Sequence, residues 1–170
     1  MVSIPGRLVI TLSLLFSVAF ISGCGSGLTN DGTLPVQNYE WLTGMLREGG
    51  FQVTTENNTF QFLNHVRNGN LFSVEARHLE ADGERITVFE YPDAAAAEEE
   101  KSIISRDGYG FSSSGSGFGV QVEVEWVDPP HWYQKGRIIV LYNGLNPDLE
   151  ILLTELLGTQ FAGLGRKTLE

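Results

Sequence analysis

Cysteine is almost absent from this sequence, because Cys24 is the only one among 170 residues. No disulfide can therefore form within the chain, whichever compartment it occupies. Cys24 lies at the end of a long apolar stretch near the N-terminus. The role of the Cys24 thiol must therefore be inferred from this position, because it cannot be a disulfide bridge within the chain.

Basic residues are also scarce. The first 23 residues contain no acidic residue, so the rest carries all 21 Asp and Glu against 10 of the 11 Lys and Arg, a net charge of −11. Such a surface repels nucleic-acid phosphates and anionic lipid headgroups. The composition therefore argues against nucleic-acid binding and against electrostatic docking on a membrane. Cations, basic peptides and uncharged partners stay open.

The sequence also lacks any pattern that indicates a catalytic or cofactor site. The only histidines are His65, His78 and His131, and none has a second ligand at a spacing typical of zinc sites. Gly115-Ser116-Gly117 lies in a Ser/Gly tract and not in a nucleophile elbow between a strand and a helix. We therefore predict no cofactor, no metal ion and no catalytic residue, although convergence of distant residues in space stays open.

The N-terminal 23 residues have the three parts of a secretory signal. Arg7 is a lone positive charge, Leu8–Ile21 is almost wholly apolar, and the small residues Ser22 and Gly23 precede the cysteine. The apolar run is shorter than the ~20 residues that a spanning helix needs. It is also apolar on every side, unlike a helix that packs on a folded domain. We predict that residues 1–23 are a signal peptide.

The sequence Ile21-Ser22-Gly23-Cys24 resembles the lipobox of bacterial lipoproteins, with Ile21 in place of the usual leucine. The resemblance implies that the Cys24 sulfur receives a diacylglycerol group and that the signal is cut just before this residue. Fatty acids such as palmitate then hold the protein on the extracytoplasmic face of a membrane. In Gram-negative lipoproteins an aspartate after the cysteine commonly signals inner-membrane retention, so Gly25 implies the outer membrane there. The alternative is a chance cysteine after an ordinary cleaved signal.

Residues 24–36 are rich in Gly, Ser and Thr, and we expect the lipidated cysteine to continue into a flexible tether. The remaining residues, 37–170, are enough for a single globular domain with a real core. Its stretch Gly136–Tyr142 and its end Phe161-Ala162-Gly163 are similar to bacterial lipoproteins that have no assigned function.

The first half of this domain has the pattern of a helix followed by strands. Asn38 is a good N-cap for a helix that Gly49-Gly50 ends. Four stretches of strand composition follow: Phe51–Thr55, Thr59–Leu63, Asn70–Arg77 and Arg85–Tyr91. Asn57-Asn58 and Asp82-Gly83 supply turns, which predicts an antiparallel meander.

The second half of the domain has the pattern of a helix, two strands and a further helix, in this order along the chain. Pro92-Asp93 opens an alanine-rich helix through about Ile104. Val120–Val127 alternates apolar and polar residues, and the continuous apolar run Ile138–Tyr142 predicts a strand at the centre of the sheet. Asn146-Pro147 begins a last helix, which Gly158 ends. The fold class is α+β, an antiparallel sheet of about six strands with three helices in the order α-β-β-β-β-α-β-β-α.

Two segments are candidate ligand-binding sites. In Pro129-Pro130-His131-Trp132-Tyr133, prolines extend a linker between strands while His131, Trp132 and Tyr133 offer hydrogen bonding and stacking. The Gly/Ser-rich stretch Gly108–Gly119 adds Tyr109 and Phe111. Packing at the end of the core is the alternative interpretation of the first segment, and an ordinary surface loop is that of the second.

The hypotheses on function belong to three classes. The first is a non-enzymatic cell-envelope lipoprotein that binds another envelope protein or a small-molecule ligand. The second is an envelope hydrolase with an unrecognised active site, and the third is an assembly accessory without a ligand. A pocket that gathers several carboxylates or histidines would favour the enzyme, whereas a shallow aromatic groove would favour binding.

Overall fold

Three helices and seven strands make up the part of the chain that the structure describes. This structure is a computed structural model, and it describes residues 36–60, 62, 71–113 and 120–163. The described residues belong to one compact unit, Leu34–Glu170. The signal peptide, Cys24 and most of residues 24–36 lie outside the described residues, and so does His65.

Each helix begins where the sequence predicts it, because a side chain caps its first turn. The helices are α1 (Tyr39–Glu48), α2 (Ala94–Lys101) and α3 (Pro147–Leu157). Asn38 accepts a hydrogen bond from the Trp41 amide at 2.8 Å, and Asp93 accepts one from the Ala96 amide at 2.9 Å. Asn146 accepts from the amide of Asp148 at 3.1 Å. These bonds satisfy amide groups that a helix start otherwise leaves without a partner.

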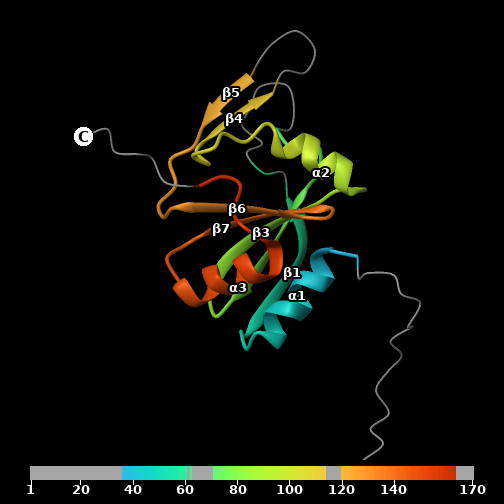
Figure 1. The fold of residues 1–170 in the computed structure, drawn as a ribbon, viewed down its shortest axis with the longest axis vertical. Helices are drawn as coiled ribbons and strands as arrows, with labels where there is room; N and C mark the ends of the chain where they lie inside the picture. The colour runs from blue at the N-terminus through green and yellow to red at the C-terminus, as the bar shows by residue number, and fades with distance from the viewer. Residues whose placement is uncertain (1–35, 61, 63–70, 114–119, 164–170) are drawn as a thin grey trace, which may run out of the picture. The chain divides into compact units, whose positions relative to one another are not determined.

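The strands form two antiparallel sheets (Figure 1). The five-stranded main sheet has the order β1-β2-β3-β7-β6, and β4 and β5 pair with each other. The bounds of the strands are β1 (Val53–Phe60), β2 (Ala76–Ala81), β3 (Glu84–Glu90), β4 (Gly110–Ser113), β5 (Val120–Glu123), β6 (Pro130–Lys135) and β7 (Ile138–Asn143). The α+β class and the three helices are confirmed, but the observed order is α-β-β-β-α-β-β-β-β-α.

The first two predicted strands are one strand. Asn57 and Asn58 do not turn the chain but lie within β1, where the pairing with β2 becomes irregular between Thr55 and Thr59. A local irregularity of this kind lets a strand continue through residues that favour turns. The turn at Asp82-Gly83 is confirmed: both residues have positive φ, 51° and 85°, as a two-residue type I′ hairpin requires.

Three other boundaries differ from the prediction. The strand expected over Asn70–Arg77 starts only at Ala76, while Phe72, before it, is buried without being in a strand. Helix α2 ends at Lys101 and not near Ile104. Over Gln121–Val127 the side chains alternate between exposed and partly buried, as expected, but of the stretch Val120–Val127 only the first four residues pair as β5.

Strand β6 is the largest correction, because the segment expected to link two strands is itself a strand. Pro130 pairs with Asn143 and Lys135 pairs with Ile138, so β6 and β7 form a hairpin. Strand β6 lies at an edge of the sheet, which is where a proline is tolerated as the first residue of a strand. Strand β7 is therefore not at the centre of the sheet but second from this edge, and its residues Ile138–Tyr142 are all buried, as predicted.

The outer edge of β6 is covered by the chain that follows α3. The Trp132 amide donates to the Ala162 carbonyl at 3.1 Å, and the Phe161 amide donates to the Trp132 carbonyl at 2.8 Å. Gly163 comes next with φ of 91°, and a Cβ atom there would lie 1.7 Å from the Pro130 carbonyl oxygen. Only glycine fits this close approach. The pairing removes an edge that could otherwise recruit another strand.

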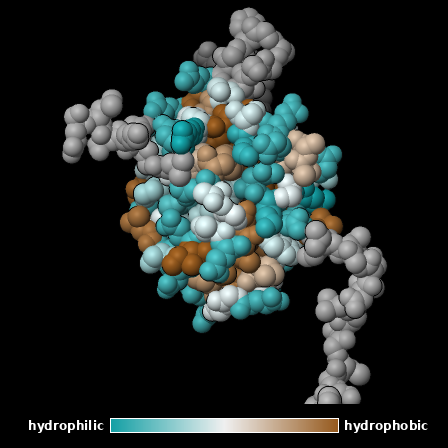
Figure 2. Space-filling model, viewed as in Figure 1, coloured by the Kyte–Doolittle hydropathy of each residue, from teal (hydrophilic) through white to brown (hydrophobic). Residues whose placement is uncertain are grey.

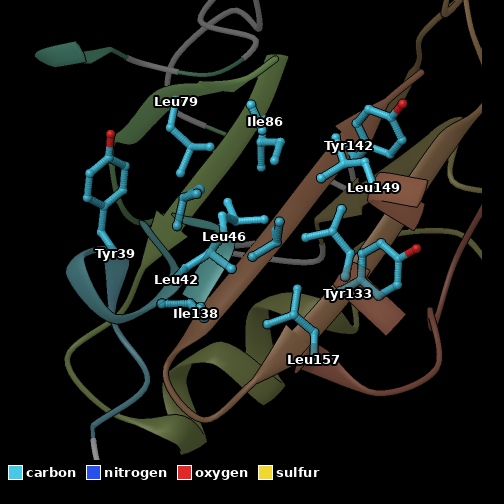
Figure 3. Close-up of a cluster of buried hydrophobic side chains, with 14 residues drawn as sticks. Tyr39, Leu42, Leu46, Leu79, Ile86, Tyr133, Ile138, Tyr142, Leu149 and Leu157 are labelled. Atoms are coloured by element: carbon cyan, nitrogen blue, oxygen red, sulfur yellow. The ribbon is translucent and has the colours of Figure 1, made fainter. Parts of the chain in front are cut away.

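The main sheet separates two cores. Helices α1 and α3 cover one face and enclose the helix-side core (Figure 3), whose members are Tyr39, Leu42, Leu46, Leu79, Ala81, Ile86, Val88, Tyr133, Ile138, Val140, Tyr142, Leu149, Leu153 and Leu157. Helix α2 and the β4-β5 pair lie on the other face (Figure 1). They enclose the aromatic core, whose members are Leu71, Phe72, Ala76, Phe89, Tyr91, Ala97, Ile104, Phe111, Trp132, Ile139, Leu141 and Ala162.

Hydrophilic residues cover much of the face shown in Figure 2, and hydrophobic residues lie between them in small groups. The large hydrophobic side chains that are exposed are Val36, Val127, Leu145 and Ile151. Exposed apolar residues in such numbers are ordinary for a protein surface.

The hydroxyl of Tyr91 is buried without a hydrogen-bond partner among the described residues. We predict that Tyr91→Phe raises the free energy of unfolding by about 1 kcal/mol, because it removes an unsatisfied polar group. Burial, followed by the nearby Glu100 carboxylate, raises the pKa of Tyr91 far above its ordinary value. Above about pH 10 the unfolded chain ionises Tyr91 while the folded chain does not, so the wild type loses further stability relative to the variant.

Urea denaturation at neutral and alkaline pH measures this difference. Tyr39→Phe is the matched control, because the Tyr39 hydroxyl donates to the His78 carbonyl at 2.7 Å. Its removal should lower the free energy of unfolding by about 1 kcal/mol. A loss of similar size in Tyr91→Phe would contradict the prediction.

Candidate functional site

The three consecutive candidates on β6 do not form one site. His131 and Tyr133 point to the helix-side face of the sheet and Trp132 points to the opposite face, because successive side chains of a strand alternate. Trp132 and Tyr133 have no exposed surface, and His131 is 8% exposed. A side chain without exposed surface cannot contact a ligand unless the fold opens. The burial therefore favours the interpretation that these aromatics pack in the core.

The candidates from the Gly/Ser-rich stretch lie beside Trp132. Phe111 is in β4, is 1% exposed and packs edge-on to Trp132, with 5.7 Å between the ring centroids. Tyr109 is half-buried, and its amide donates to the Asp107 carboxylate at 3.1 Å. Residues 114–119 of the stretch lie outside the described residues. Phe111 and Trp132 thus come together, as members of the aromatic core.

His131 connects the sheet to the end of the chain that covers it. Its Nδ1 lies 2.9 Å from the amide oxygen of Gln160 and 3.8 Å from a Glu150 carboxylate oxygen. An amide oxygen only accepts, so Nδ1 carries the proton in this arrangement. The ring stacks on Tyr142 at 5.6 Å between centroids. These contacts hold α3 and the following residues against β6, which is a structural role.

The two described histidines, His78 and His131, belong to no group of metal-ligating side chains. Among the described residues, no group of three or more His, Cys, Asp or Glu side chains is arranged to hold a metal ion. The His78 ring packs at a tilt of 31° against Phe60, with 4.2 Å between the ring centroids, and its Nδ1 lies 3.1 Å from the Thr87 hydroxyl. Burial, and next the positive charge of Arg85, lowers the pKa of His78 below its usual range. His78 is therefore neutral at physiological pH.

A polar groove between α1 and the edge of the main sheet is the candidate site that the structure adds. Its cavity volume is about 270 Å³, and its lining residues are Tyr39, Glu40, Thr43, Arg47, Thr55, Asn57 and Arg77. Tyr39, Thr43 and Arg47 are spaced four residues apart, so they share one face of the helix. Glu40 also belongs to α1, and strands β1 and β2 supply Thr55, Asn57 and Arg77. We call this site the α1–β1 groove.

In the α1–β1 groove an arginine lies over the ring of a tyrosine. The guanidinium carbon of Arg77 is 3.6 Å from the centroid of the Tyr39 ring, and its Nη1 is 3.2 Å from a Glu40 carboxylate oxygen. The Tyr39 hydroxyl donates to the His78 carbonyl, which fixes the ring. Burial raises the pKa of Tyr39 above its ordinary value, even though the Arg77 charge lowers it, so the phenol stays a neutral donor.

Thr43 and Arg47 complete the helix side of the groove. The Thr43 hydroxyl donates to the Tyr39 carbonyl at 2.8 Å within the helix. Arg47 is exposed, and its Nη2 makes one long hydrogen bond, 3.4 Å, to the Val53 carbonyl. Most of its N–H groups are therefore available, since a guanidinium carries five.

Sequence reasoning missed the α1–β1 groove for a definable reason. Arg77 belongs to the polar set of an alternating segment, which indicates only that it faces water. Its stacking partner Tyr39 is far away in the sequence, and no local pattern shows that α1 lies over the edge of the sheet. A signal was present in composition alone: Arg47 and Arg77 are among few basic residues of an acidic chain.

No described helix is both long and apolar enough to cross a membrane. Comparison of the chain with protein-family models, with curated proteins and with solved structures found no match.

Proposed function

We propose that this chain is a lipid-anchored protein of the bacterial cell envelope whose folded domain binds a partner without catalysing a reaction. The observation that carries the proposal is the sequence Ile21-Ser22-Gly23-Cys24 directly after an apolar run that starts with one basic residue. The compact unit begins at Leu34, on the C-terminal side of Cys24, so removal of residues 1–23 leaves that unit whole.

The energetics of lipid anchoring support this location. One acyl chain holds a protein only marginally, but each buried methylene contributes ~0.8 kcal/mol, so two or three chains make release very slow. With two or three acyl chains, attachment to the membrane does not need electrostatic attraction between the surface of the domain and the lipid headgroups. This agrees with a net charge of −11 after residue 23, which anionic headgroups repel.

Binding fits the α1–β1 groove better than hydrolysis does. A hydrolase needs a nucleophile beside a general base, or a water molecule that such a base activates. In the groove, the hydroxyl of Thr43 donates to the Tyr39 carbonyl and the carboxylate of Glu40 contacts Arg77, so the two are not arranged as a nucleophile beside its general base. The groups that remain are guanidinium, hydroxyl and amide groups, which recognise a ligand through hydrogen bonds.

Protease treatment of intact spheroplasts tests the location. We expect added protease to degrade the domain while the spheroplasts stay intact. The signal peptide exports the domain, and the lipid on Cys24 then holds it on the outer face of the cytoplasmic membrane or beyond it. A cytoplasmic protein of the same cells serves as the control and should stay intact until detergent is added. If the chain is protected to the same extent as that control, the proposed envelope location is wrong.

A further inference from the structure

We infer that the α1–β1 groove binds a small ligand through a carboxylate group, with Arg77 as the primary anion-binding residue and Arg47 as the second. The inference rests on the binding role proposed above and names the ligand class of the same domain. Four features of the groove carry it: the fixed orientation of Arg77, the carboxylate already on it, the available donors around it and the size of the cavity.

Arg77 is held in a fixed orientation. Its guanidinium lies on the Tyr39 ring at 3.6 Å, and that ring is anchored by the hydrogen bond from its hydroxyl to the His78 carbonyl. Stacking of this kind leaves the N–H groups at the rim of the guanidinium plane free to donate. The rim presents a planar fork, which matches the two oxygens of a carboxylate.

The partner that Arg77 already has shows which chemistry fits this position. Its Nη1 contacts a carboxylate oxygen of Glu40 at 3.2 Å. The side chain of Glu40 is 67% exposed, whereas that of Arg77 is only 26% exposed. An ion pair with such an exposed partner is weak and exchanges readily. Glu40 therefore acts as an internal substitute, which a carboxylate ligand in the groove can replace.

Other donors surround the same space. Arg47 lies two turns beyond Glu40 along α1, and within the described residues its side chain makes only the 3.4 Å bond to the Val53 carbonyl. From β1, Thr55 offers a hydroxyl and Asn57 an amide, and neither side chain has a hydrogen-bond partner within the described part of the chain. These groups can bind further oxygens of the ligand.

The size and charge of the groove restrict the ligand further. A cavity of about 270 Å³ is slightly below the ~300–1,000 Å³ typical of drug-sized ligands, so the ligand is small. The acidic surface of the domain opposes the approach of any anion, but charges beyond the Debye length of ~10 Å are largely screened at 0.1 M salt. Among the residues that line the groove, the two guanidinium groups of Arg47 and Arg77 outnumber the carboxylate of Glu40, and the Glu56 carboxylate acts on Tyr39 from outside this lining.

Calorimetric titration of the whole chain, purified in detergent, tests the inference with succinate as the probe and inorganic phosphate as the comparison. We expect saturable succinate binding that Arg77→Gln weakens by about tenfold or more, because a charge-assisted hydrogen bond is lost. Glu40→Gln should strengthen binding several-fold, since the internal competitor is removed. Arg85→Gln is the matched control: Arg85 is 61% exposed on β3, outside the groove, and should leave the affinity unchanged.

Each outcome has a defined meaning. Arg47→Gln changes an exposed side chain, so a loss of affinity in this variant supports the site even if Arg77→Gln unfolds. Absence of saturable succinate binding, or equal affinity in the Arg77→Gln and Arg85→Gln variants, would overturn the inference. Binding of phosphate without succinate would overturn the carboxylate class. None of these results depends on the membrane anchor. The spheroplast experiment therefore tests the envelope location independently of ligand binding.

Discussion

Replacing Trp132 with alanine is expected to lower the free energy of unfolding by about 3–5 kcal/mol, the range for truncation of a buried tryptophan. Trp132 has no exposed surface and lies among Phe72, Phe89 and Phe111, with ring centroids 5.7 to 6.2 Å away. Its indole N–H donates to the Gly108 carbonyl at 3.2 Å. The variant loses this bond and leaves a cavity at the centre of the aromatic core.

Trp126→Ala is the matched control for this prediction. The Trp126 indole donates to the same Gly108 carbonyl, at 3.0 Å, but the side chain is only partly buried. We expect a loss of about 1–2 kcal/mol, because less apolar area returns to water. Urea denaturation followed by far-ultraviolet circular dichroism measures both variants. Equal losses in the two variants would mean that Trp132 does not occupy the core as described.

Replacing Cys24 with alanine is expected to move the protein from the membrane fraction to the soluble fraction. Alanine has no sulfur to form a thioether, so the variant cannot gain the acyl chains, whose buried methylenes contribute ~0.8 kcal/mol each. Fractionation of washed membranes, followed by immunoblotting, measures the change. Cells grown with labelled palmitate should also label the wild-type chain and not the variant.

Ser26→Ala controls for a general effect of substitution near the processing site. Ser26 lies outside the sequence Ile21-Ser22-Gly23-Cys24, so this variant should remain in the membrane fraction and keep the label. Persistence of Cys24→Ala in washed membranes would refute the lipid anchor.

The elements that the sequence predicts well are those with a local cause. Asn38, Asp93 and Asn146 each accept a hydrogen bond from an amide two or three residues ahead, so the start of each helix depends only on neighbouring residues. The same holds for the turn at Asp82-Gly83, which needs only two residues that adopt positive φ.

The elements that the sequence predicts poorly depend on distant partners. The segment Pro130–Lys135 is a strand because β7 pairs with it on one side and Ala162 covers the other. The sequence alone does not show that this segment lies at the edge of the sheet, where a strand tolerates proline. Its prolines therefore indicate a linker. In β1, Asn57 and Asn58 favour a turn locally, but pairing with β2 on both sides of the irregularity overrides this preference.

The candidate site also combines properties that are local in the sequence with properties that depend on distant residues. His131, Trp132 and Tyr133 have the side-chain chemistry of a binding site, but alternation along β6 sends neighbouring side chains to opposite faces. The α1–β1 groove exists only because α1 brings Tyr39 under Arg77 of β2, a contact that joins distant parts of the chain. Composition alone could indicate that the few basic residues deserve inspection, but it could not show that Arg47 and Arg77 line the same groove.

Intact mass spectrometry of the protein purified from its native membranes tests whether Cys24 is lipidated after removal of residues 1–23. We expect a chain that begins at Cys24 and carries the mass of a diacylglycerol thioether, with or without a further acyl group on the new amine. A chain that keeps its N-terminal methionine and an unmodified thiol at Cys24 would contradict it.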